Sequence, residues 1–315
     1  MPSPGAASGL WLEVVMAWVD GGSRTTESSI GRDAGRLLGF SAMHVAYQGE
    51  PGAYSERAVL ALFPDAEPMP CETVRLVFSR VTSGEADAGV VPLENSQAGS
   101  VNETYDLLQH TSMLRIVGEA MVRVDHALLG VPGARLEQVR RAHSHWQALA
   151  QCEEFLSSLQ IVPVPVYDTA GAARMIAERG DRQDAAIASV EAGTALGLSV
   201  LSERIQTEKE NLTRFVAIST DATGLGAADK TSLVMAVLDE PGSLLASLQP
   251  FAERAINLHK LESRPRRGKA FEYVFYVDLM AAADSPEVEE ALASVAQHTS
   301  FLRVLGSYRS AGDPV

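Results

Sequence analysis

The stretch Asn211-Leu212-Thr213-Arg214-Phe215 places a hydroxyl and a guanidinium side by side, and Val216-Ala217-Ile218 follows it directly. The apolar run 215–218 predicts a buried strand. The polar pair therefore lies where an irregular segment enters a rigid strand, and such a place can hold polar groups in fixed geometry at a cleft. The alternative is an ordinary strand entry with a capping threonine and a surface arginine. The rest of the chain decides between the two.

The length and charge of the chain limit its possible functions. Its 315 residues, 46 % of them hydrophobic, are enough for two or three domains with sizeable cores, and no segment approaches the ~20 apolar residues of a membrane span. The formal net charge of −14 argues against nucleic acid or a membrane surface as the main partner, although a local pocket can still bind an anionic substrate. Cys71 and Cys152 have no metal-ligand spacing, and we expect both to be reduced core residues of a cytoplasmic protein.

Residues 1–42 differ from the rest of the chain. The apolar stretch 10–19 is short, carries Glu13 and follows no basic residue, which is unlike a signal peptide, and further acidic residues argue against an organelle transit peptide. Clear periodicity starts just after Met43. We therefore expect either a disordered N-terminal extension at 1–42 or a natural start near Met43, with a regulatory arm as the alternative.

From residue 43 to residue 221, predicted strands alternate with predicted helices, which indicates α/β layers with parallel strands. Polar side chains cluster where several of these strands end, and in open α/β sheets ligands bind at that edge. Two lobes facing one cleft would bring the clusters together. For the cluster that follows the strand 86–92, the alternative is an elaborate helix cap. The clustered residues are Glu94, Asn95 and Ser96 after the strand 86–92, Ser144 and His145 at the end of the strand 139–144, and Asp168 and Thr169 after the strand 161–167.

The turn Gln48-Gly49-Glu50-Pro51-Gly52-Ala53-Tyr54-Ser55 joins a predicted strand at 44–47 to a helix that starts near Ser55. Ser55 is the expected N-cap. The glycines let backbone approach a ligand, and the N-terminus of the helix favours anions. The alternative is a simple strand–turn–helix connection. His126, on the apolar predicted strand 126–131, is more typical of a buried structural histidine than of a catalyst.

Residues 230–309 follow a different pattern, after a linker at 222–229 that is rich in alanine and glycine. A strand at 231–238 precedes a helix that opens with Pro241-Gly242-Ser243, and two strands follow at 256–262 and 271–279. A helix opened by Ser285-Pro286-Glu287 and a last strand at 301–306 complete the order βαββαβ within about 80 residues, which is the ferredoxin-like arrangement. The basic segment 264–269 is expected to be a turn.

At this point the chain resembles the prephenate dehydratases and the closely related arogenate dehydratases, with their C-terminal ACT domain, over roughly residues 43–308. The family usually has proline where this chain has Trp146. The stretches 167–173 and 185–189 look more like plant arogenate dehydratases. The resemblance implies a two-lobed α/β catalytic region similar to periplasmic binding proteins, followed by a ferredoxin-like domain. The matching stretches are Gly49-Glu50-Pro51-Gly52-Ala53-Tyr54-Ser55, 91–101, 144–152, Thr213-Arg214-Phe215 and Glu262-Ser263-Arg264-Pro265.

The resemblance implies a decarboxylating dehydration of prephenate to phenylpyruvate in phenylalanine biosynthesis, with arogenate as the alternative substrate or both accepted. Because aromatisation of the ring drives the step, we expect no cofactor and no metal. Thr213 falls on the family's catalytic position, where its hydroxyl would orient the leaving hydroxyl or pass it a proton from a relay. Substrate-binding roles are implied for Tyr54, Ser55, Asn95, Ser96, Ser144, Gln151, Thr169 and Arg214, and relay or tuning roles for Glu94, His145 and Asp168.

Alternatives remain for several of these residues. Arg214 either clamps a carboxylate with its planar fork or forms a structural ion pair. Glu94 and Asp168 either tune the site or cap helices, and His145 is either a relay or structural. A non-catalytic solute-binding protein and an amino-acid sensor that has lost catalysis are competing functions, and the intact Thr213-Arg214-Phe215 motif argues against mere binding.

The C-terminal domain, by the same resemblance, senses phenylalanine as an effector. Since ACT domains usually pair between subunits, a homodimer or homotetramer is implied. The residues implied in effector binding are Gly242, Ser243, Leu244, Asn257, Leu258, Glu262, Ser263 and Arg264.

Overall fold

The computed structural model describes residues 42–266 and 272–315, which form two compact units. One unit contains Ala42–Leu114, Gly118–Asp221 and Ala311–Val315, and the other contains Ala222–Ser310 with Arg115–Val117. All but the last residue of the expected extension at 1–42 lies outside the described residues. Within the described ranges, no helix is long and apolar enough to cross a membrane.

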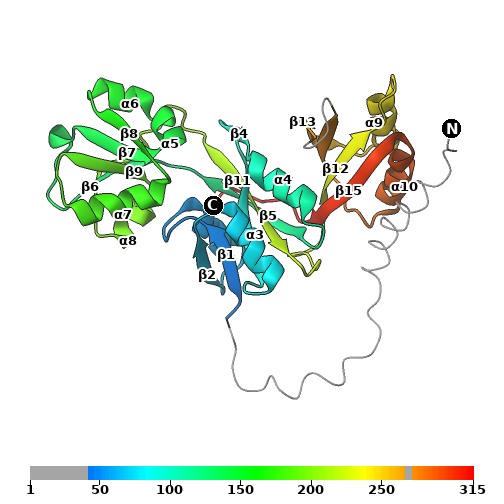
Figure 1. The fold of residues 1–315 in the computed structure, drawn as a ribbon, viewed down its shortest axis with the longest axis horizontal. Helices are drawn as coiled ribbons and strands as arrows, with labels where there is room; N and C mark the ends of the chain where they lie inside the picture. Colours follow the sequence, from blue (N-terminus) through cyan, green and yellow to red (C-terminus); the bar gives the residue numbers. More distant parts are fainter. Residues whose placement is uncertain (1–41, 267–271) are drawn as a thin grey trace, which may run out of the picture. The chain divides into compact units, whose positions relative to one another are not determined.

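The first lobe of the larger unit is a six-stranded sheet in the order β2-β1-β3-β11-β5, with β4 paired to β3 (Figure 1). Strand β1 runs parallel to β2 and β3, whereas β11 runs antiparallel to β3. Seven of the eight residues of β11 are buried, which confirms the strand expected from the run 215–218. The elements are β1 (His44–Gln48), α2 (Tyr54–Leu62), β2 (Glu67–Cys71), α3 (Val74–Ser83), β3 (Ala88–Asn95), β4 (Gly99–Ser100), α4 (Asn102–His110), β5 (Arg115–Arg123) and β11 (Leu212–Ser219).

The second lobe is a five-stranded sheet in the order β10-β6-β9-β7-β8 with a hydrophobic core on each face. Strand β7 runs parallel to β8 and β9, but β6 runs antiparallel to β9 and β10. The expectation of parallel strands is therefore wrong for β6 and β10 of this lobe and for β11 of the first lobe. The elements are β6 (Ala127–Gly130), η2 (Leu136–Gln138), β7 (Arg141–His145), α5 (Trp146–Gln151), α6 (Glu153–Ser158), β8 (Val162–Val166), α7 (Thr169–Arg179), β9 (Asp184–Ala188), α8 (Val190–Ala195) and β10 (Ser199–Ser202).

The chain crosses between the lobes twice, at 124–126 after β5 and at 203–211 before β11. Hydrogen bonds tie the crossings together. The backbone nitrogen of Val124 donates to the Asn211 oxygen (2.8 Å), and that of His126 donates to the Gln206 side chain (3.0 Å). This pairing holds the start of β11, and with it Thr213, beside the entrance to the second lobe. Cys71 and Cys152 are buried and free, as expected.

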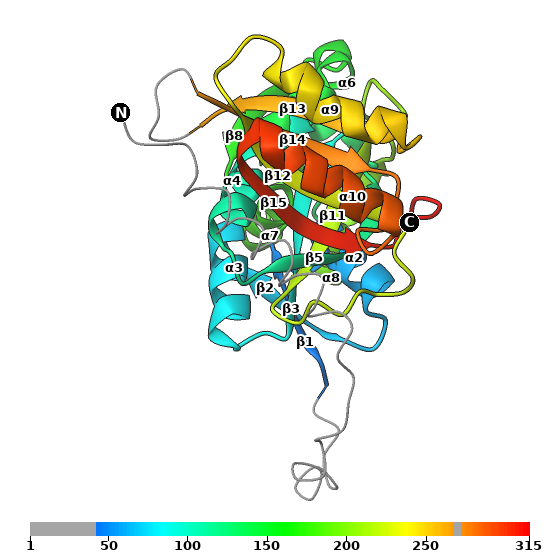
Figure 2. The same ribbon diagram turned by 90° about the vertical axis from the view of Figure 1, so that its right-hand side faces the viewer.

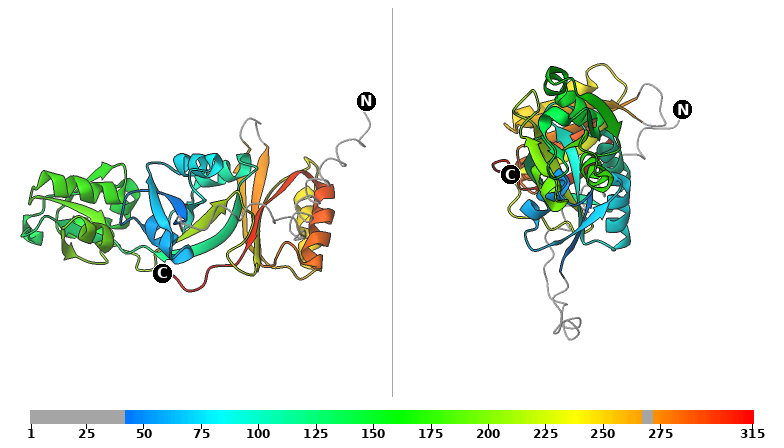
Figure 3. Two further views of the ribbon diagram at one scale, coloured as in Figure 1. Left: turned by 90° about the horizontal axis from the view of Figure 1, so that it is seen from below. Right: turned by 90° about the vertical axis from the view of Figure 1, so that its left-hand side faces the viewer.

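The smaller unit confirms the order βαββαβ. Its antiparallel sheet has the order β13-β14-β12-β15, and both helices pack on one face of it (Figures 2 and 3). A core that includes Leu233, Phe251 and Leu292 joins the helices to the sheet. Arg264, placed by the sequence in a turn, lies in β13, and residues 267–271 of the expected turn and strand lie outside the described residues. The elements are β12 (Lys230–Val237), α9 (Ser243–Glu253), β13 (Leu258–Pro265), β14 (Tyr273–Leu279), α10 (Pro286–Val295), η3 (Ala296–His298) and β15 (Thr299–Tyr308).

Candidate active site

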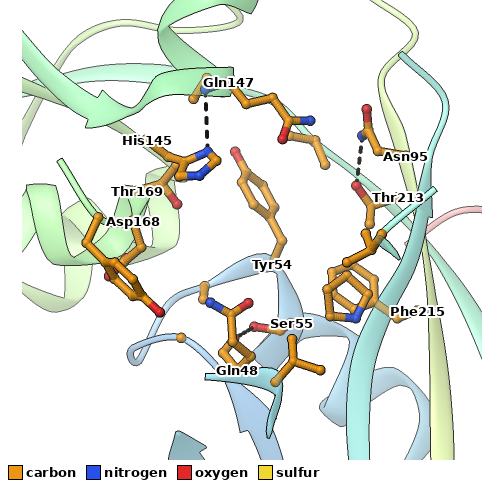
Figure 4. A pocket seen from close by; sticks show the side chains of 18 of the residues that line it. Gln48, Tyr54, Ser55, Asn95, His145, Gln147, Asp168, Thr169, Thr213 and Phe215 are labelled. Carbon is orange, nitrogen blue, oxygen red and sulfur yellow. Dashed lines mark hydrogen bonds between the residues drawn. The ribbon is translucent and has the colours of Figure 1, made fainter. Parts of the chain in front are cut away.

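A pocket of about 450 Å³ in the larger unit is lined by residues of both lobes (Figure 4). This volume suits a small organic ligand. The pocket gathers most of the polar clusters that the sequence places at strand ends. Of the residues predicted for the site, Tyr54, Ser55, Asn95, His145, Gln151, Asp168, Thr169 and Thr213 line it. Glu94, Ser96, Ser144 and Arg214 are absent from its lining.

Thr213 and Asn95 lie opposite each other on β11 and β3, and both are nearly buried. Nδ2 of Asn95 donates to Oγ1 of Thr213 at 2.9 Å (Figure 4). Oδ1 of Asn95 accepts from the backbone nitrogens of Gln97 (3.1 Å) and Ala98 (2.9 Å), which fixes the orientation of the amide. Because Thr213 accepts a hydrogen bond from Asn95, its own hydroxyl proton can be donated to a group in the pocket.

Arg214 belongs to a buried ion pair and does not line the pocket. Its Nε lies 2.7 Å from Oε2 of Glu119, and its Nη1 lies 4.0 Å from the carboxylate of Glu94. Its neighbours Thr213 and Phe215 both line the pocket, as the alternation of side chains along a strand requires. These contacts match the structural ion pair that is the alternative role of Arg214. The carboxylate clamp stays a prediction that this position does not support.

Ser144 and Ser96 bind backbone instead of facing the pocket. Oγ of Ser144 donates to the Ile187 oxygen at 2.6 Å inside the second sheet. Oγ of Ser96 accepts from the nitrogen of Leu212 at 3.0 Å and so holds the start of β11 against the end of β3. Substrate binding by these two serines stays a prediction without geometric support.

Five helices have their N-cap residue in the pocket lining: α2, α3, α4, α5 and α7. A helix N-terminus carries a partial positive charge, and its backbone N–H groups bind anions. Among the described residues that line the pocket there is no lysine or arginine, whereas Glu103 and Asp168 bring two carboxyl groups. Recognition of an anionic substrate in this pocket therefore depends on backbone amides and neutral donors.

The helix N-termini differ in whether a side chain caps them. Side chains of Thr73, His145 and Asp168 cap α3, α5 and α7. No side chain caps α2, whose N-cap is Ala53, or α4, whose N-cap is Val101. The expectation that Ser55 is the N-cap is wrong, because its hydroxyl donates to the Gln48 oxygen instead. Asp168 caps a helix and also lines the pocket, and its role in tuning the site stays a prediction.

His145 is held in one tautomer. Its Nδ1 accepts from the nitrogen of Gln147 at 3.4 Å, so the ring proton of the neutral form lies on Nε2 (Figure 4). Burial lowers the pKa of His145, and the charge of Asp168 only partly opposes this shift. His145 is therefore suited to donate a hydrogen bond as a neutral group. The adjoining Trp146 is 65 % exposed and is absent from the pocket lining.

Sequence reasoning missed three residues that the structure joins to the site. His126 is buried as expected, but it also lines the pocket, with Nε2 2.9 Å from Oε1 of Gln151 and Nδ1 3.3 Å from the Tyr54 hydroxyl. Asn211 donates to the same Gln151 oxygen at 3.1 Å. Glu119 holds Arg214. Asn211 belongs to the stretch 211–215 with which the sequence analysis began, so its place beside Thr213 could have marked it as a site residue. Glu119 could not be found in this way, because its contact with Arg214 depends on strand pairing that the sequence does not give.

The residues implied in effector binding lie at two places in the smaller unit. Ser263 of β13 pairs with Phe275, which pairs with Met235 near the end of β12, so this part of β13 and the start of α9 lie toward the same end of the sheet. Leu258 pairs with Leu279 at the other end. Since α9 has 11 residues and rises about 1.5 Å per residue, its ends are roughly 16 Å apart. Gly242 and Asn257, which flank α9, therefore do not meet within one chain.

Comparison with known proteins identifies both units. The prephenate dehydratase family matches residues 45–223, and the ACT domain matches residues 231–297. Arogenate dehydratase/prephenate dehydratase 2, a chloroplastic protein of Arabidopsis thaliana, is 42 % identical over 279 residues, which cover 85 % of this chain and 73 % of that protein.

Two solved structures resemble the whole described fold. The prephenate dehydratase of Arthrobacter aurescens in complex with L-Phe is 34 % identical, with a TM-score of 0.77, over 85 % of this chain and 90 % of that one. GqqA, described as a novel type of quorum-quenching acylase, is also 34 % identical with a TM-score of 0.77, over 85 % of this chain and 98 % of that one.

Proposed function

The chain belongs to the prephenate dehydratase family, and from this premise we propose that its pocket converts prephenate to phenylpyruvate, with water and carbon dioxide as the other products. The ACT domain makes this step in phenylalanine biosynthesis responsive to phenylalanine. Arogenate is the alternative substrate, because the Arabidopsis relative is named for both activities. The observation that carries the proposal is the Thr213 hydroxyl, oriented by Asn95 so that its proton is available to the pocket.

The reaction needs one donor at the leaving hydroxyl. As the ring carbon–oxygen bond breaks, the electron pair of the carbon–carboxylate bond enters the ring, carbon dioxide leaves, and the ring becomes aromatic. Negative charge develops on the departing oxygen, which accepts a proton passed on by the Thr213 hydroxyl and leaves as water, and Thr213 recovers a proton from solvent. Thr213 donates a hydrogen bond to this oxygen, and the Asn95 amide polarises the Thr213 hydroxyl from behind. A positioned proton donor of this kind contributes roughly 10²–10⁴-fold to the rate.

The substrate also presents carboxylate groups that the pocket must bind. The N-termini of α2 and α4, which no side chain caps, supply backbone N–H groups for this purpose. Neutral His145 and the amide of Gln151 add donors from the second lobe. Since both lobes contribute, the substrate is held in one orientation while the two leaving groups depart, which is the main advantage of a closed site.

We propose further that the protein is a cytoplasmic homodimer or homotetramer. The effector residues that flank α9 are too far apart to bind one phenylalanine within a chain, and a second subunit supplies the missing half. Strand β13 is an edge of the sheet and exposes Leu261, 45 % accessible, which a paired subunit would cover. Light scattering at several protein concentrations, with and without phenylalanine, tests the assembly, and a monomer in all samples contradicts it.

The test of the function is turnover by the purified protein with prephenate and, separately, with arogenate. Phenylpyruvate and phenylalanine are followed, and Thr213→Ala and Thr213→Ser serve as variants. We expect phenylpyruvate to form faster, Thr213→Ser to keep activity and Thr213→Ala to lose it by at least roughly 10²-fold. Faster phenylalanine formation assigns arogenate as the substrate. If the protein forms no product from either compound but still binds phenylalanine, the proposed enzymatic function fails and the alternative function of an amino-acid sensor is supported.

A further inference from the structure

A series of side-chain hydrogen bonds connects Thr213 in the first lobe to Gln151 in the second lobe. Its direction is set at Asn95. Two backbone N–H groups donate to Oδ1 of Asn95, so its Nδ2 must be a donor. Nδ2 of Asn95 lies 2.7 Å from Oδ1 of Asn211 and 2.9 Å from Oγ1 of Thr213. Backbone N–H groups cannot reverse their polarity, so they set the direction of every hydrogen bond further along the chain.

The direction carries into the second lobe through Asn211. Because its Oδ1 accepts from Asn95, the remaining Nδ2 of Asn211 is the donor, and it lies 3.1 Å from Oε1 of Gln151. Asn211 is fully buried, so the opposite amide orientation would leave donor facing donor without water to relieve it. The acceptor of Gln151 is thereby fixed toward the interior.

His126 completes the arrangement from the other side. Its Nε2 lies 2.9 Å from the same Gln151 oxygen, which can only accept, so Nε2 carries the proton. Nδ1 of His126 is then unprotonated. The Tyr54 hydroxyl lies 3.3 Å from it but donates its proton to the Asp125 oxygen at 2.6 Å. With both lone pairs of its oxygen occupied, Gln151 keeps its NH₂ group for the pocket that it lines, and the structure gives that nitrogen no partner within the described residues.

We propose that His126 and Asn211 are positioning residues, which hold Gln151 with its amide NH₂ group toward the pocket as a donor to a substrate carboxylate or carbonyl oxygen. The proposal rests on the proposed function for the identity of that substrate. The two residues at the ends of this hydrogen-bond series then have the same role, because Thr213 and Gln151 both donate hydrogen bonds into the pocket. Neither His126 nor Asn211 needs to touch the substrate.

The test compares His126→Met, which removes the donor, with His126→Gln, whose amide nitrogen can replace Nε2. We expect His126→Met to raise KM by roughly tenfold or more with a smaller change in kcat, because a donor to an anionic group is lost in the ground state and the transition state alike. His126→Gln should stay within about threefold of the unaltered protein. In a Gln151→Ala background, His126→Met should add no further increase in KM, because the group it orients is gone.

The proposal is overturned if His126→Met and His126→Gln raise KM equally. It is also overturned if His126→Met raises KM as much in the Gln151→Ala background as in the unaltered protein, because either result shows a structural role. A second measurement does not depend on turnover. The ¹⁵N chemical shifts of the His126 ring at pH 7.5 should show a neutral ring with its proton on Nε2, and a proton on Nδ1 rejects the proposal. If the unaltered protein turns over neither prephenate nor arogenate, the proposed function fails while the ring tautomer still decides the hydrogen-bond chain.

Discussion

The polarity of one amide decides whether Thr213 can donate to the pocket. Asn95→Asp replaces the amide donor with a carboxylate oxygen, which would accept the hydroxyl proton of Thr213 and draw it away from the leaving group. We expect kcat to fall by roughly 10²-fold with a smaller change in KM. The exposed neighbour Gln97→Glu adds the same charge without contacting Thr213 and serves as the control. Initial rates of product formation check this, and equal rates for the two variants would count against the role of Asn95.

The lowered pKa of His126 predicts how stability depends on pH. Burial is the main cause of the lowered pKa, because it disfavours the protonated ring in the folded protein. In the unfolded chain the same ring binds a proton near pH 6.5. The stabilising contribution is complete above about pH 6.5 and is lost as the pH falls through the lowered folded value. We expect His126→Gln to lose less free energy of unfolding between pH 7.5 and pH 5 than the unaltered protein. Urea unfolding at both pH values measures this, and a parallel loss in both proteins contradicts it.

Sequence indicated Thr213 at a strand entry and Asn95 at a strand end, and the family resemblance added Gln151. It could not separate Thr213 from Arg214, since neighbouring residues of a strand face opposite sides and only strand pairing shows which side carries the pocket. The same ambiguity applies to Ser144, whose hydroxyl bonds the next strand. His126 was assigned correctly to the core, but its pocket contacts depend on a helix that begins about twenty residues later.

The turn before α2 fits against α8 with no space for a side chain. A Cβ at Gly52 would lie 2.5 Å from the Cα of Ala192, and its φ of +85° also disfavours other residues. The Gly52 oxygen accepts from the Ser189 hydroxyl at 2.7 Å, so this contact joins the lobes where α2 begins at the pocket. We expect Gly52→Ala to force the lobes apart and to lower kcat/KM by at least roughly tenfold.

The control for Gly52→Ala is Gly84→Ala, at the C-terminus of α3. Gly84 has a similar φ of +78°, but apart from its own chain neighbours nothing lies within 4 Å of the position that a methyl group would take, so this variant tests backbone strain without a clash. Kinetics and thermal unfolding are measured for both. If the two variants lose stability and activity equally, the clash between the lobes is not the cause.

Strand β2 illustrates why an element can escape sequence analysis. Its sequence Glu67-Pro68-Met69-Pro70-Cys71 contains two prolines, which interrupt the hydrogen-bond ladder of a central strand. The structure tolerates them because β2 is an edge strand, which among the described strands pairs with β1 alone. The prolines also protect this edge from pairing with other chains. The long periodic helices and the strand at β11, by contrast, follow directly from the apolar pattern.

The last residues of the chain return to the catalytic unit after β15. The nitrogen of Ala311 donates to Oε1 of Glu119 at 2.9 Å, and Val315 pairs with β5 through bonds to Met121 and Arg123. Glu119 in turn holds Arg214, the neighbour of Thr213. We expect truncation after Ser310 to lower the melting temperature by several degrees and kcat/KM severalfold, since it removes a partner of a buried carboxylate.

Truncation after Asp313 is the matched comparison, because it keeps the Ala311 nitrogen and removes only the pairing of Val315. We expect it to retain most of the activity. Phenylalanine response is measured in both variants, since the segment is continuous with the last strand of the ACT domain. If truncation after Ser310 leaves activity, stability and phenylalanine response unchanged, the contact between Ala311 and Glu119 has no role.

The two-unit organisation was predictable from the change of pattern near residue 222, because the βαββαβ order is local along the chain. The two crossings between the lobes were not predictable, because the sequence of a strand does not show in which lobe it finds its neighbours. The hydrogen bonds that join the two crossings bring Asn211 to Gln151, which stand 60 residues apart.

If the pocket binds an anionic substrate through fixed backbone dipoles, as we propose, the net charge of −14 affects how that substrate arrives. Helix dipoles act over about one helical turn, whereas the repulsion between the whole protein and an anion extends over the Debye length, about 10 Å at 0.1 M salt. Added salt should therefore shorten the range of the repulsion and leave the short-range attraction nearly intact. We expect kcat/KM to rise by roughly twofold or more between about 10 and 150 mM ionic strength. A decrease would indicate cationic steering, and an increase would mean that this protein captures its substrate more rapidly in salt than in dilute buffer.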